Sequence, residues 1–543
     1  MTVQHETIQA PQHGQTQQDS EKSSAEFNSN QLASDRVGIL LYHDGAWEAS
    51  PNDARAAADR EHSLTFYAAL KAYPWAVVWS LAVSMSLIME GYSTMLIGSF
   101  YAYPTFAYRF GQFDEDSETY QIPLPWQSAM GSGPQAAALI TALLNGYIIH
   151  RWGYKPAFRL GVVLMTSFIF LSVFGMSVRI QVVGQILCGL VFYLTFGGIS
   201  CVLKEVHTDS DSASIPWGIF ATTGPAYSSE LCPLPLRPYL TAFVNIGFAT
   251  GQLINAGVLY GFLNCDDDWA WRIPFCIQWV WLPGLAIVAL FMPESPWHFV
   301  RQGRFANAEK VIHRLVADDE KQYAKGHVAV MIRTNNLEKE LAKGTTYLDC
   351  FKGTDRRRTE IALMAFLGQI TCGAQFACSA SYFYQQADLE THYIYMLNLA
   401  GTVVAFCGTI GGCVLMKHVG HRSLYLTGMV GMSTLLLAIG CLDIGEHTDG
   451  VNPVKWTQAG LCIVWLLVFS LSVGPAGWVI PAEVSSTRLR AQTFVLARNA
   501  YYLGQIVANV LQPYMINPLG WDWRGETSRF GRKSSRPYGP LTA

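Results

Sequence analysis

Long apolar stretches that almost lack charged residues recur along most of this chain, and they constrain its fold more than any other feature. A helix needs about 20 predominantly apolar residues to cross a bilayer core. Windows of that length lie near residues 74–99, 127–149, 158–178, 181–203, 240–262, 270–292, 361–383, 394–416, 423–442, 457–480 and 491–512. They show almost none of the 3.6-residue polar stripe that marks a soluble amphipathic helix. The sequence therefore predicts an all-α membrane protein.

The small share of charged residues supports this class and argues against several others. Only 14% of the 543 residues are charged, against about 25% in soluble proteins. The net charge of -3 gives no reason to expect a nucleic-acid partner. The 12 cysteines lie mostly inside apolar windows and lack metal-ligand spacing. We therefore expect no metal site and no cofactor. The sequence also shows no paired intramembrane cluster of histidine and acidic residues, which argues against an enzyme.

The loops between the windows alternate in charge. Loops after odd-numbered windows are acidic, as at 114–118 and 266–268, whereas those after even-numbered windows are basic, most of all at 301–358. Basic loops stay on the cytosolic side of a membrane. We therefore predict a cytosolic amino terminus. The polar residues 1–65 are predicted to form a disordered cytosolic tail.

The chain divides into two similar halves around a long basic loop, residues 293–358. Loop motifs recur at matching positions of the two halves. The pairs are NGYIIHRWGYK (145–155) with MKHVGHRSLYL (416–426), and SSELCPLPLRPYL (228–240) with AEVSSTRLRAQT (482–493). Parallel repeats of this kind build one large transporter fold, in which the substrate lies near the membrane midplane between the halves.

Further motifs stand at fixed places in this repeat. In chain order the motifs are EGYST (90–94), Gly146 with Arg151 to Lys155, Glu230 with Pro233 and Arg237, PESPW (293–297), Glu483 with Arg490, and NPLGWDWRGET (517–527). In this order they resemble the sugar porters of the major facilitator superfamily. Within that superfamily the chain is most similar to the fungal alpha-glucoside (maltose-type) permeases.

The resemblance implies a fold and a function. The fold is the major facilitator fold, with helix bundles over 70–292 and 359–527 joined by a cytosolic linker over 293–358. The function is import of an alpha-glucoside such as maltose by alternating access, with proton symport as a further expectation. The protein is expected to be a monomer in the lipid bilayer of the plasma membrane. A monosaccharide (hexose) transporter and a non-transporting sugar sensor of the same fold stay open as alternatives.

Polar side chains near the membrane midplane are costly, so they point to the substrate path. Amides match sugar hydroxyls without carrying charge, and a tryptophan face suits the C–H face of a sugar ring. The resemblance also places the glutamines and the tryptophan of this set on sugar-contacting positions of the family. The candidate substrate-binding residues are Gln252, Gln369, Gln375, Trp478, Asn499 and Tyr501. The alternative for each is a hydrogen bond between helices.

Proton coupling needs a titratable group in the membrane that faces the cavity. The resemblance assigns this role to Glu90 in the first window and gives it Arg498 in the last window as partner. Ser93 and Ala138 stand where the alpha-glucoside permeases carry further acids. We therefore expect weakened dependence on the proton gradient. The alternatives are a purely structural Glu90–Arg498 pair, or a Glu90 that merely lies near the mouth of the cavity.

Acidic and basic residues also alternate at the predicted cytosolic helix ends. Carboxylate–guanidinium pairs there can hold the two halves together on one side, and they must break and re-form during alternating access. The candidate gating residues are Arg151, Glu230, Arg237, Glu294, Arg422, Glu483 and Arg490. The alternative is that they are interfacial anchors that follow the positive-inside bias.

Two segments depart from the family pattern. Joining Gly189 to Ile215 gives CGIPWGIF, close to the family pattern, so residues 190–214 are expected to be an intron-derived insertion. The polar residues 528–543 stand where the family has a twelfth helix. The last helix is therefore expected to be missing, and this tail to be aberrant. The rival interpretation is a true variant with eleven spans.

Overall fold

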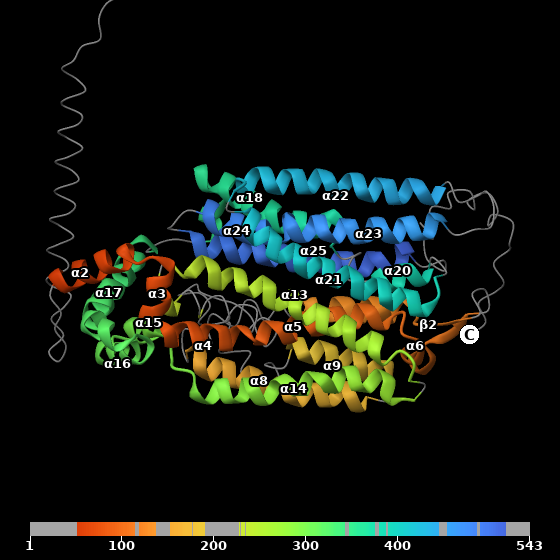
Figure 1. Ribbon diagram of the computed structural model, residues 1–543, viewed down its shortest axis with the longest axis horizontal. Helices are drawn as coiled ribbons and strands as arrows, with labels where there is room; N and C mark the ends of the chain where they lie inside the picture. Colours follow the sequence, from red (N-terminus) through yellow and green to blue (C-terminus); the bar gives the residue numbers. More distant parts are fainter. Residues whose placement is uncertain are drawn as a thin grey trace, which may run out of the picture.

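A computed structural model of the chain shows an elongated bundle of helices, most of which run along its long axis (Figure 1). Residues 191–214 of the predicted insertion and the predicted tail 528–543 lie outside the described residues. The structure describes residues 51–114, 119–136, 139, 153–175, 177–190, 227, 230–233, 235–265, 267–342, 347–374, 380–386, 389–416, 418–444, 453–485 and 489–516.

The amino-terminal half contains helices at the first six predicted spans. The first span is formed by α4 (Pro74–Ser84) and α5 (Ser86–Phe100), which meet at Met85. The other helices of this half are the one over 124–136, α8 (Tyr154–Phe174), α9 (Val178–Leu190), α13 (Arg237–Gly261) and α14 (Trp269–Phe291).

The carboxy-terminal half contains helices at the remaining five predicted spans. The first of these spans is broken, because α18 (Gly353–Gln369) runs into η3 (Ile370–Ala374), where Gly373 has a φ of 95°. The other helices of this half are α20 (Ala380–Gln386), α21 (Thr391–Leu415), α22 (His421–Ile444), α23 (Pro453–Leu471), α24 (Val473–Val484) and α25 (Arg490–Ile516).

Several of these helices have the length and composition of membrane spans. Large apolar side chains such as Val163, Val280 and Leu437 are exposed on them, as expected for a surface that meets lipid. Within the described ranges, six helices are long and apolar enough to cross a membrane: Pro74–Phe100, Tyr154–Phe174, Trp269–Phe291, Thr391–Leu415, His421–Leu442 and Lys455–Pro481. The predicted all-α membrane class is thereby confirmed.

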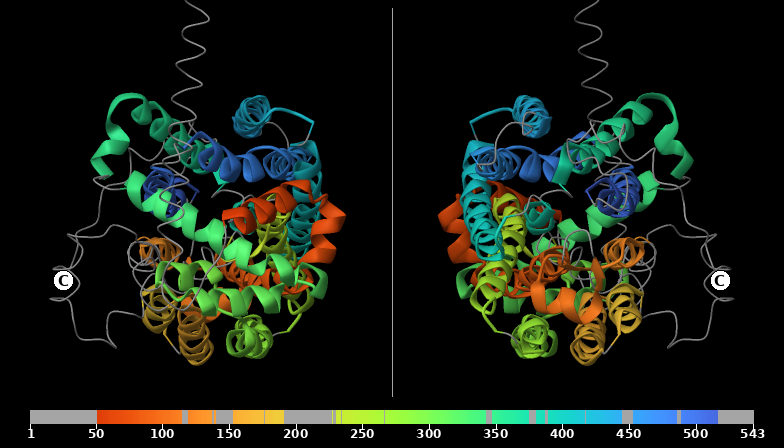
Figure 2. Two further views of the ribbon diagram at one scale, coloured as in Figure 1. Left: turned by 90° about the vertical axis from the view of Figure 1, so that its left-hand side faces the viewer. Right: turned by 90° about the vertical axis from the view of Figure 1, so that its right-hand side faces the viewer.

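The two halves lie side by side when the bundle is viewed along its long axis (Figure 2). Helix α13 packs against α21 across the halves and against α5 within its own half. A Cβ added to Gly91 would overlap the backbone of α13, and one added to Gly251 would overlap the backbone of α5. These small residues therefore let two helix backbones touch, as is common between membrane helices.

We call the two ends of the bundle the hairpin end and the linker end. At the hairpin end, an antiparallel pair of short strands places Phe113 opposite Tyr120. The elements there are α6 (Pro104–Phe110), β1 (Gln112–Asp114) and β2 (Thr119–Gln121). The elements at the linker end (Figure 1) include α15 (Pro296–Arg301), α16 (Phe305–Leu315), η1 (Asp318–Tyr323), α17 (Ala324–Ala342) and η2 (Tyr347–Phe351).

Part of the tail that was predicted to be disordered over 1–65 is a packed helix. Helix α2 (Pro51–Ser63) lies against α17, and α3 (Phe66–Ala72) follows it towards α4. Ala54 and Ala57 of α2 are buried, and Arg60 Nη2 lies 2.6 Å from Glu320 Oε1. The polar composition concealed this helix, because two alanines are enough to give it a small packing face.

Candidate functional site

Arg498 on α25 lies within a cage of aromatic rings. Its Cζ atom lies 4.5 Å from the ring centre of Trp478, 4.7 Å from that of Tyr501 and 4.8 Å from that of Tyr502. The ring of Phe366 on α18 follows at 5.8 Å. A guanidinium over aromatic faces is attracted by their quadrupoles, more strongly where water is excluded. The cage therefore holds the cation without a direct carboxylate partner.

Glu90 on α5 faces this cation from the other half of the bundle. The charges of Glu90 and Arg498 attract each other, but no ion pair within 4.0 Å joins these two residues. The Oε2 atom of Glu90 and the Nη1 atom of Arg498 are both buried and lack hydrogen-bond partners in the described part of the chain. The structure thus places the two charges of the predicted coupling pair near each other across the halves, without a direct ion pair between them.

Gln369 is held by hydrogen bonds to a neighbouring helix. Its Nε2 atom donates to the carbonyl oxygens of Val473 at 3.2 Å and Gly474 at 2.9 Å. These carbonyls lie at the start of α24, the helix that carries Trp478. Gln369 therefore makes the hydrogen bonds between helices that were the alternative interpretation, at the start of the helix that carries Trp478; its contact with sugar stays a prediction.

The other predicted substrate-binding residues are placed as follows. Gln252 on α13 is half-buried, and so are Asn499 and Tyr501 on α25. Tyr501 OH accepts a hydrogen bond from Nε2 of Gln505 at 3.0 Å. Gln375 lies outside the described residues. Of this set, Trp478 and Tyr501 are brought together at the Arg498 cage.

Buried polar atoms that lack a hydrogen-bond partner among the described residues recur on the helices that meet between the halves. Each such atom costs about 1–3 kcal/mol unless a partner is supplied. A ligand rich in hydroxyl groups offers both donors and acceptors. Besides Glu90 and Arg498, these atoms are Ser93 Oγ on α5, Asn255 Oδ1 and Nδ2 on α13, Ser381 Oγ and Gln385 Oε1 on α20, Asn398 Nδ2 on α21 and Asn499 Oδ1 on α25.

The sequence analysis missed most of these groups. Asn255 and Asn398 are amides within apolar windows, the same signal that singled out the glutamines. Ser381 and Gln385 belong to the broken span. Polar residues within apolar windows were therefore visible in the sequence. Only the structure shows which of their buried atoms lack a hydrogen-bond partner among the described residues.

Glu294, in the segment between α14 and α15, caps another helix. Its Oε1 atom accepts the backbone N–H of Tyr154 at 2.7 Å, and its Oε2 atom accepts that of Lys155 at 3.0 Å. These are the first two residues of α8, where an anion is stabilised by unpaired N–H groups. Burial raises the pKa of the Glu294 carboxyl, and the backbone N–H groups of Lys155, Ser295 and Tyr154 oppose that rise.

Glu230 joins the same cluster of groups at the linker end. Its Oε1 atom accepts hydrogen bonds from Arg301 Nη2 and from Tyr154 OH, each at 3.0 Å, and its Oε2 atom accepts one from Ser295 Oγ. All of these partners belong to the amino-terminal half and to α15. In this conformation, the hydrogen bonds that Glu230 and Glu294 make with described residues therefore join the amino-terminal half to the linker and do not cross to the carboxy-terminal half.

Of the other predicted gating residues, only Arg422 has a side chain within the described part of the chain. Arg422, near the start of α22, is exposed. Arg151 and the side chains of Arg237, Glu483 and Arg490 lie outside the described part of the chain.

Sequence comparisons agree with this geometry. Residues 79–209 and 213–527 match the family described as "Sugar (and other) transporter". A maltose permease of Saccharomyces cerevisiae is 31% identical over 484 residues, which cover 88% of this chain and 74% of the permease. An alpha-glucosides permease of the same species is 30% identical over 485 residues, which cover 88% and 76% of the two chains. These relatives are named as permeases, so the expectation of a transport protein rather than an enzyme is confirmed.

Solved structures confirm the major facilitator fold. The E. coli xylose transporter XylE in a partially occluded inward open conformation aligns with a TM-score of 0.63 at 17% identity, covering 83% of this chain and 95% of XylE. A structure of XylE bound to 6-bromo-6-deoxy-D-glucose aligns with a TM-score of 0.62, also at 17% identity, covering 85% and 90% of the two chains. The chain, with its two helical halves and a family match that extends over both, belongs to the sugar transporter family.

Proposed function

We propose that the chain imports an alpha-glucoside such as maltose by alternating access and that it couples this import to protons. Family membership and the names of its permease relatives support the substrate class. One observation carries the proposal further: Arg498, caged by rings of one half, faces Glu90 of the other half, whose Oε2 atom is buried and lacks a hydrogen-bond partner among the described residues.

The polar groups between the halves fit an uncharged ligand with many hydroxyls. The side chains of Asn255 and Asn398 offer amide atoms there, and those of Ser93 and Ser381 offer hydroxyl oxygens. Each unpaired atom favours binding of a group that completes its hydrogen bonds. A sugar can satisfy donors and acceptors at once, whereas an apolar solute would leave them unpaired.

The Glu90–Arg498 arrangement fits proton coupling. An ionised carboxylate with one oxygen buried and unpaired is costly in a membrane helix, and an attraction that stops short of an ion pair offsets only part of that cost. Protonation of Glu90 removes its charge and leaves Arg498 to the aromatic cage. A movement of the two halves that changes this separation would therefore change the affinity of Glu90 for its proton. Because the two groups belong to different halves, protonation of Glu90 and the separation of the halves are thermodynamically coupled.

The contacts across the halves near the hairpin end fit one state of an alternating-access cycle. Tyr395 OH on α21 donates to the carbonyl oxygen of Ser99 on α5 at 2.8 Å, and the rings of Tyr103 and Tyr395 meet edge to face at 5.5 Å. We take this end to be the closed one. The gating residues at the linker end would then form pairs across the halves only in the opposite state of the cycle, in which the linker end is closed.

We place the linker end in the cytosol and the protein in the plasma membrane. The basic loops all fall on this side under the positive-inside rule. The exposed side chains of Arg356, Arg357 and Arg358 at the start of α18 follow the same rule. The hairpin end would then face outwards, so that sugar enters there and leaves beside the linker.

Uptake in yeast that lacks its own sugar transporters tests the proposal. Cells that carry this chain should accumulate radiolabelled maltose faster than cells with an empty vector. Uptake of glucose without uptake of maltose would favour the hexose transporter. A chain that reaches the membrane and moves neither sugar would contradict import and favour the sensor.

A further inference from the structure

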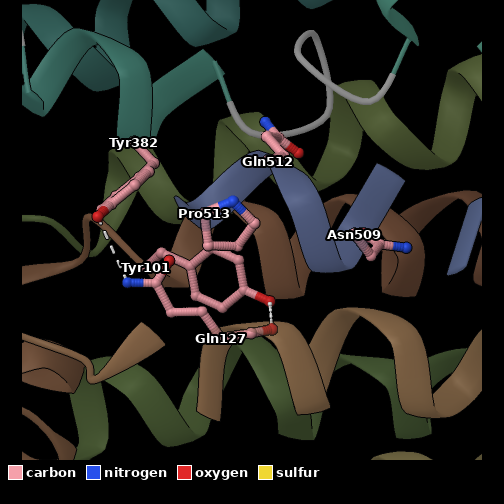
Figure 3. Close-up of a pocket in the computed structure, with 6 residues that line it drawn as sticks. All are labelled: Tyr101, Gln127, Tyr382, Asn509, Gln512 and Pro513. Carbon is pink, nitrogen blue, oxygen red and sulfur yellow. Dashed lines mark hydrogen bonds between the residues drawn. The ribbon is translucent and has the colours of Figure 1, made fainter. Parts of the chain in front are cut away.

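The small cavity between the two halves near the hairpin end has no room for a second ligand. Its space takes about one water-sized sphere. Tyr101 OH donates to the backbone oxygen of Gln127 at 3.0 Å beside it. Figure 3 shows the residues that line the cavity: Tyr101, Gln127, Tyr382, Asn509, Gln512 and Pro513. A ligand larger than water therefore has to bind elsewhere on the molecule.

Large apolar side chains become exposed where the linker leads into the carboxy-terminal half. In α15, α16 and η1, the large apolar side chains are all buried or half-buried. In η2, nearer to the carboxy-terminal half, Leu348 is 70% exposed and Phe351 is 50% exposed. The exposed apolar side chains continue on α18 with Ile361 and Met364. A continuous apolar surface of this kind is expected where a protein meets lipid.

The orientation of η2 is fixed by a buried contact with α25. Cys350 is fully buried, and Thr493 Oγ1 on α25 donates to its Sγ atom at 3.8 Å. Leu348 and Phe351 are three residues apart, so they lie on one side of this 3₁₀ helix. That side is exposed. Helix η2 therefore packs on the protein with one side and turns two apolar side chains outwards with the other.

The outward face of α18 carries a cation followed by apolar side chains. Arg357, Ile361 and Met364 are spaced by four and three residues, so they share one face of the helix. The side chain of Arg357 is 81% exposed, whereas Ala362 and Phe366 on the opposite face are buried. Such a face fits the boundary of a bilayer, with the apolar side chains against acyl chains and the cation among the headgroups.

A contact between α18 and α22 places Arg357 at the level of the headgroups. Tyr425 OH on α22 donates to the carbonyl oxygen of Ala365 on α18 at 2.9 Å, and both helices begin at the linker end (Figure 1). The axial rise is about 12 Å from Arg357 to Ala365, and about 6 Å from His421 at the start of α22 to Tyr425. Arg357 therefore lies about 6 Å beyond the start of α22, within a headgroup layer of about 5–8 Å.

The segment around Arg357 carries a net positive charge. Residues 347–360 contain four cations and three carboxylates. Lys352 Nζ lies 2.8 Å from Asp349 Oδ1, and Arg358 Nη1 lies 4.0 Å from Asp355 Oδ1. Exposed ion pairs of this kind contribute little to stability, so a competing anion can replace them. All four cations are exposed: Lys352, Arg356, Arg357 and Arg358.

Two of these arginines share one carboxylate. Arg356 Nε lies 2.8 Å from Glu360 Oε1, and Arg357 Nη1 lies 3.7 Å from Glu360 Oε2. Each guanidinium has five N–H donors, more than half a carboxylate can accept. The pair can therefore donate to a phosphate group as well, which arginine binds in a well-defined geometry.

We propose that η2 and the start of α18 bind an anionic phospholipid of the cytosolic leaflet. Arg356 and Arg357 hold the headgroup phosphate, and Lys352 adds positive charge beside it. The acyl chains lie along the apolar side chains of Phe351 and Met364. The choice of leaflet rests on the proposed orientation of the linker end, whereas binding itself does not.

The combination of charge and apolar surface favours this ligand over others. A zwitterionic headgroup brings its own cation to the arginines, so an anionic headgroup binds more tightly. A free phosphate ion would use the arginines but not the exposed side chains of Leu348 and Phe351. A phospholipid uses both, because its phosphate and its acyl chains are joined in one molecule.

Native mass spectrometry of the full chain tests the site. The purified protein in a neutral detergent is offered equal amounts of phosphatidylserine and phosphatidylcholine, and the bound lipids are counted from the masses. The wild type should bind phosphatidylserine in preference. In the double variant Arg356→Gln with Arg357→Gln, the affinity for phosphatidylserine should fall about fivefold for each cation removed. Binding of phosphatidylcholine should stay unchanged.

Two further variants separate charge from apolar contact. Arg304→Gln is the matched control, because Arg304 is an exposed arginine at the start of α16, a helix that exposes no large apolar side chain. This variant should bind both lipids as the wild type does. Phe351→Gln keeps every charge and removes an apolar contact, so it should also weaken binding of phosphatidylserine. Unchanged binding in Phe351→Gln would contradict a lipid and indicate a site for free anions.

Three other results would overturn the lipid site. They are equal binding of the two lipids by the wild type, undiminished binding of phosphatidylserine by the double variant, and displacement of the lipid by inorganic phosphate but not by chloride at the same ionic strength. These measurements do not involve transport. A failure of maltose uptake would therefore count against the proposed function and leave the lipid site standing.

Discussion

The carboxylate of Glu294 lies where a side chain on Gly153 would begin. A Cβ added to Gly153 would come within 2.6 Å of Glu294 Oε2. Gly153 also has a φ of 91°, a region that glycine adopts readily and other residues do not. The contact joins the end of α14 to the start of α8. It explains why a long apolar helix is followed by a carboxylate between two prolines: that carboxylate caps the neighbouring helix.

Gly153→Ala should therefore destabilise the protein for two reasons. The left-handed backbone conformation costs about 1–3 kcal/mol for a residue with a side chain, and the overlap with Glu294 adds to that cost. Gly303→Ala is the matched control, because Gly303 has a φ of 75° and a Cβ there would meet no atom within 4 Å. Thermal melting of the purified protein should show a larger loss for Gly153→Ala. Equal losses would contradict the role given to Glu294.

Glu90→Gln should separate transport from the proton gradient. Glutamine keeps the shape of the side chain and removes the charge that attracts Arg498. We expect uptake down a gradient to continue, or to cease, but without protonophore-sensitive accumulation. Because Ser93 stands where the resemblance implies another acid, we expect the wild type to depend on external pH less than a typical symporter does.

The control for Glu90→Gln is Glu360→Gln, an exposed carboxylate beside Arg356 and Arg357. This change should leave accumulation as in the wild type. The measurement is sugar accumulation against external pH, with and without a protonophore. Strong protonophore-sensitive accumulation that survives Glu90→Gln would exclude Glu90 as the coupling group.

Gln369→Leu should lower both stability and sugar affinity. The change removes the two hydrogen bonds that tie α18 to the start of α24, at a cost of about 0.5–1.5 kcal/mol each. Trp478, less than two turns further along, would then be displaced. A residue that only touched sugar would raise the KM without lowering the melting temperature. Measuring both quantities on one preparation therefore separates the two roles, and Trp478→Ala serves as the comparison.

The sequence was sufficient to predict the helices and the fold, because a bilayer demands long apolar segments. The resemblance gave Arg498 to Glu90 as a partner; the structure shows an attraction between the two charges, and their role in proton coupling stays a prediction. It could not predict the ring cage, since Phe366 and Trp478 lie far apart in the chain and meet Arg498 only through the packing of α18, α24 and α25. The sequence suggested a gating role for Glu294 but not its contact with the start of α8. That contact depends on how α8 and α14 pack, which the neighbours of Glu294 in the sequence do not reveal.

The amino-terminal helix shows a similar limit of composition. Residues 1–65 are polar, yet α2 docks on α17. Gly326 makes this possible, because a Cβ there would overlap the backbone of Asp53 and would also come within 2.8 Å of the Ala57 side chain. A single small residue on each helix is a weak signal in a sequence. In the structure it decides whether two helices can touch.

Gly326→Val should therefore release α2 from α17. The expected result is faster protease cleavage within residues 51–63 at an unchanged rate elsewhere. Leu337→Val is the control, since Leu337 is an exposed residue of the same helix. Equal cleavage of Gly326→Val and the wild type would show that α2 is held by other contacts, such as that between Arg60 and Glu320.

Docking at this place should also weaken as the pH falls. His327 on α17 is buried, and its Nε2 atom lies 2.9 Å from Tyr73 OH. Burial lowers the pKa of His327 below 6.5, and the charges of Glu61 and Glu320 oppose that shift only in part. The undocked form, with its pKa near 6.5, binds more protons between that value and the lowered pKa. Docking is therefore strongest above this range and is lost as the pH falls through it.

Hydrogen exchange of α2 should show full protection at about pH 7.5 and a loss of protection towards about pH 5. His327→Gln cannot acquire the charge, so its exchange at α2 should stay constant over the same range. A wild type whose protection of α2 does not change with pH, or a His327→Gln variant that loses it in parallel, would contradict this assignment.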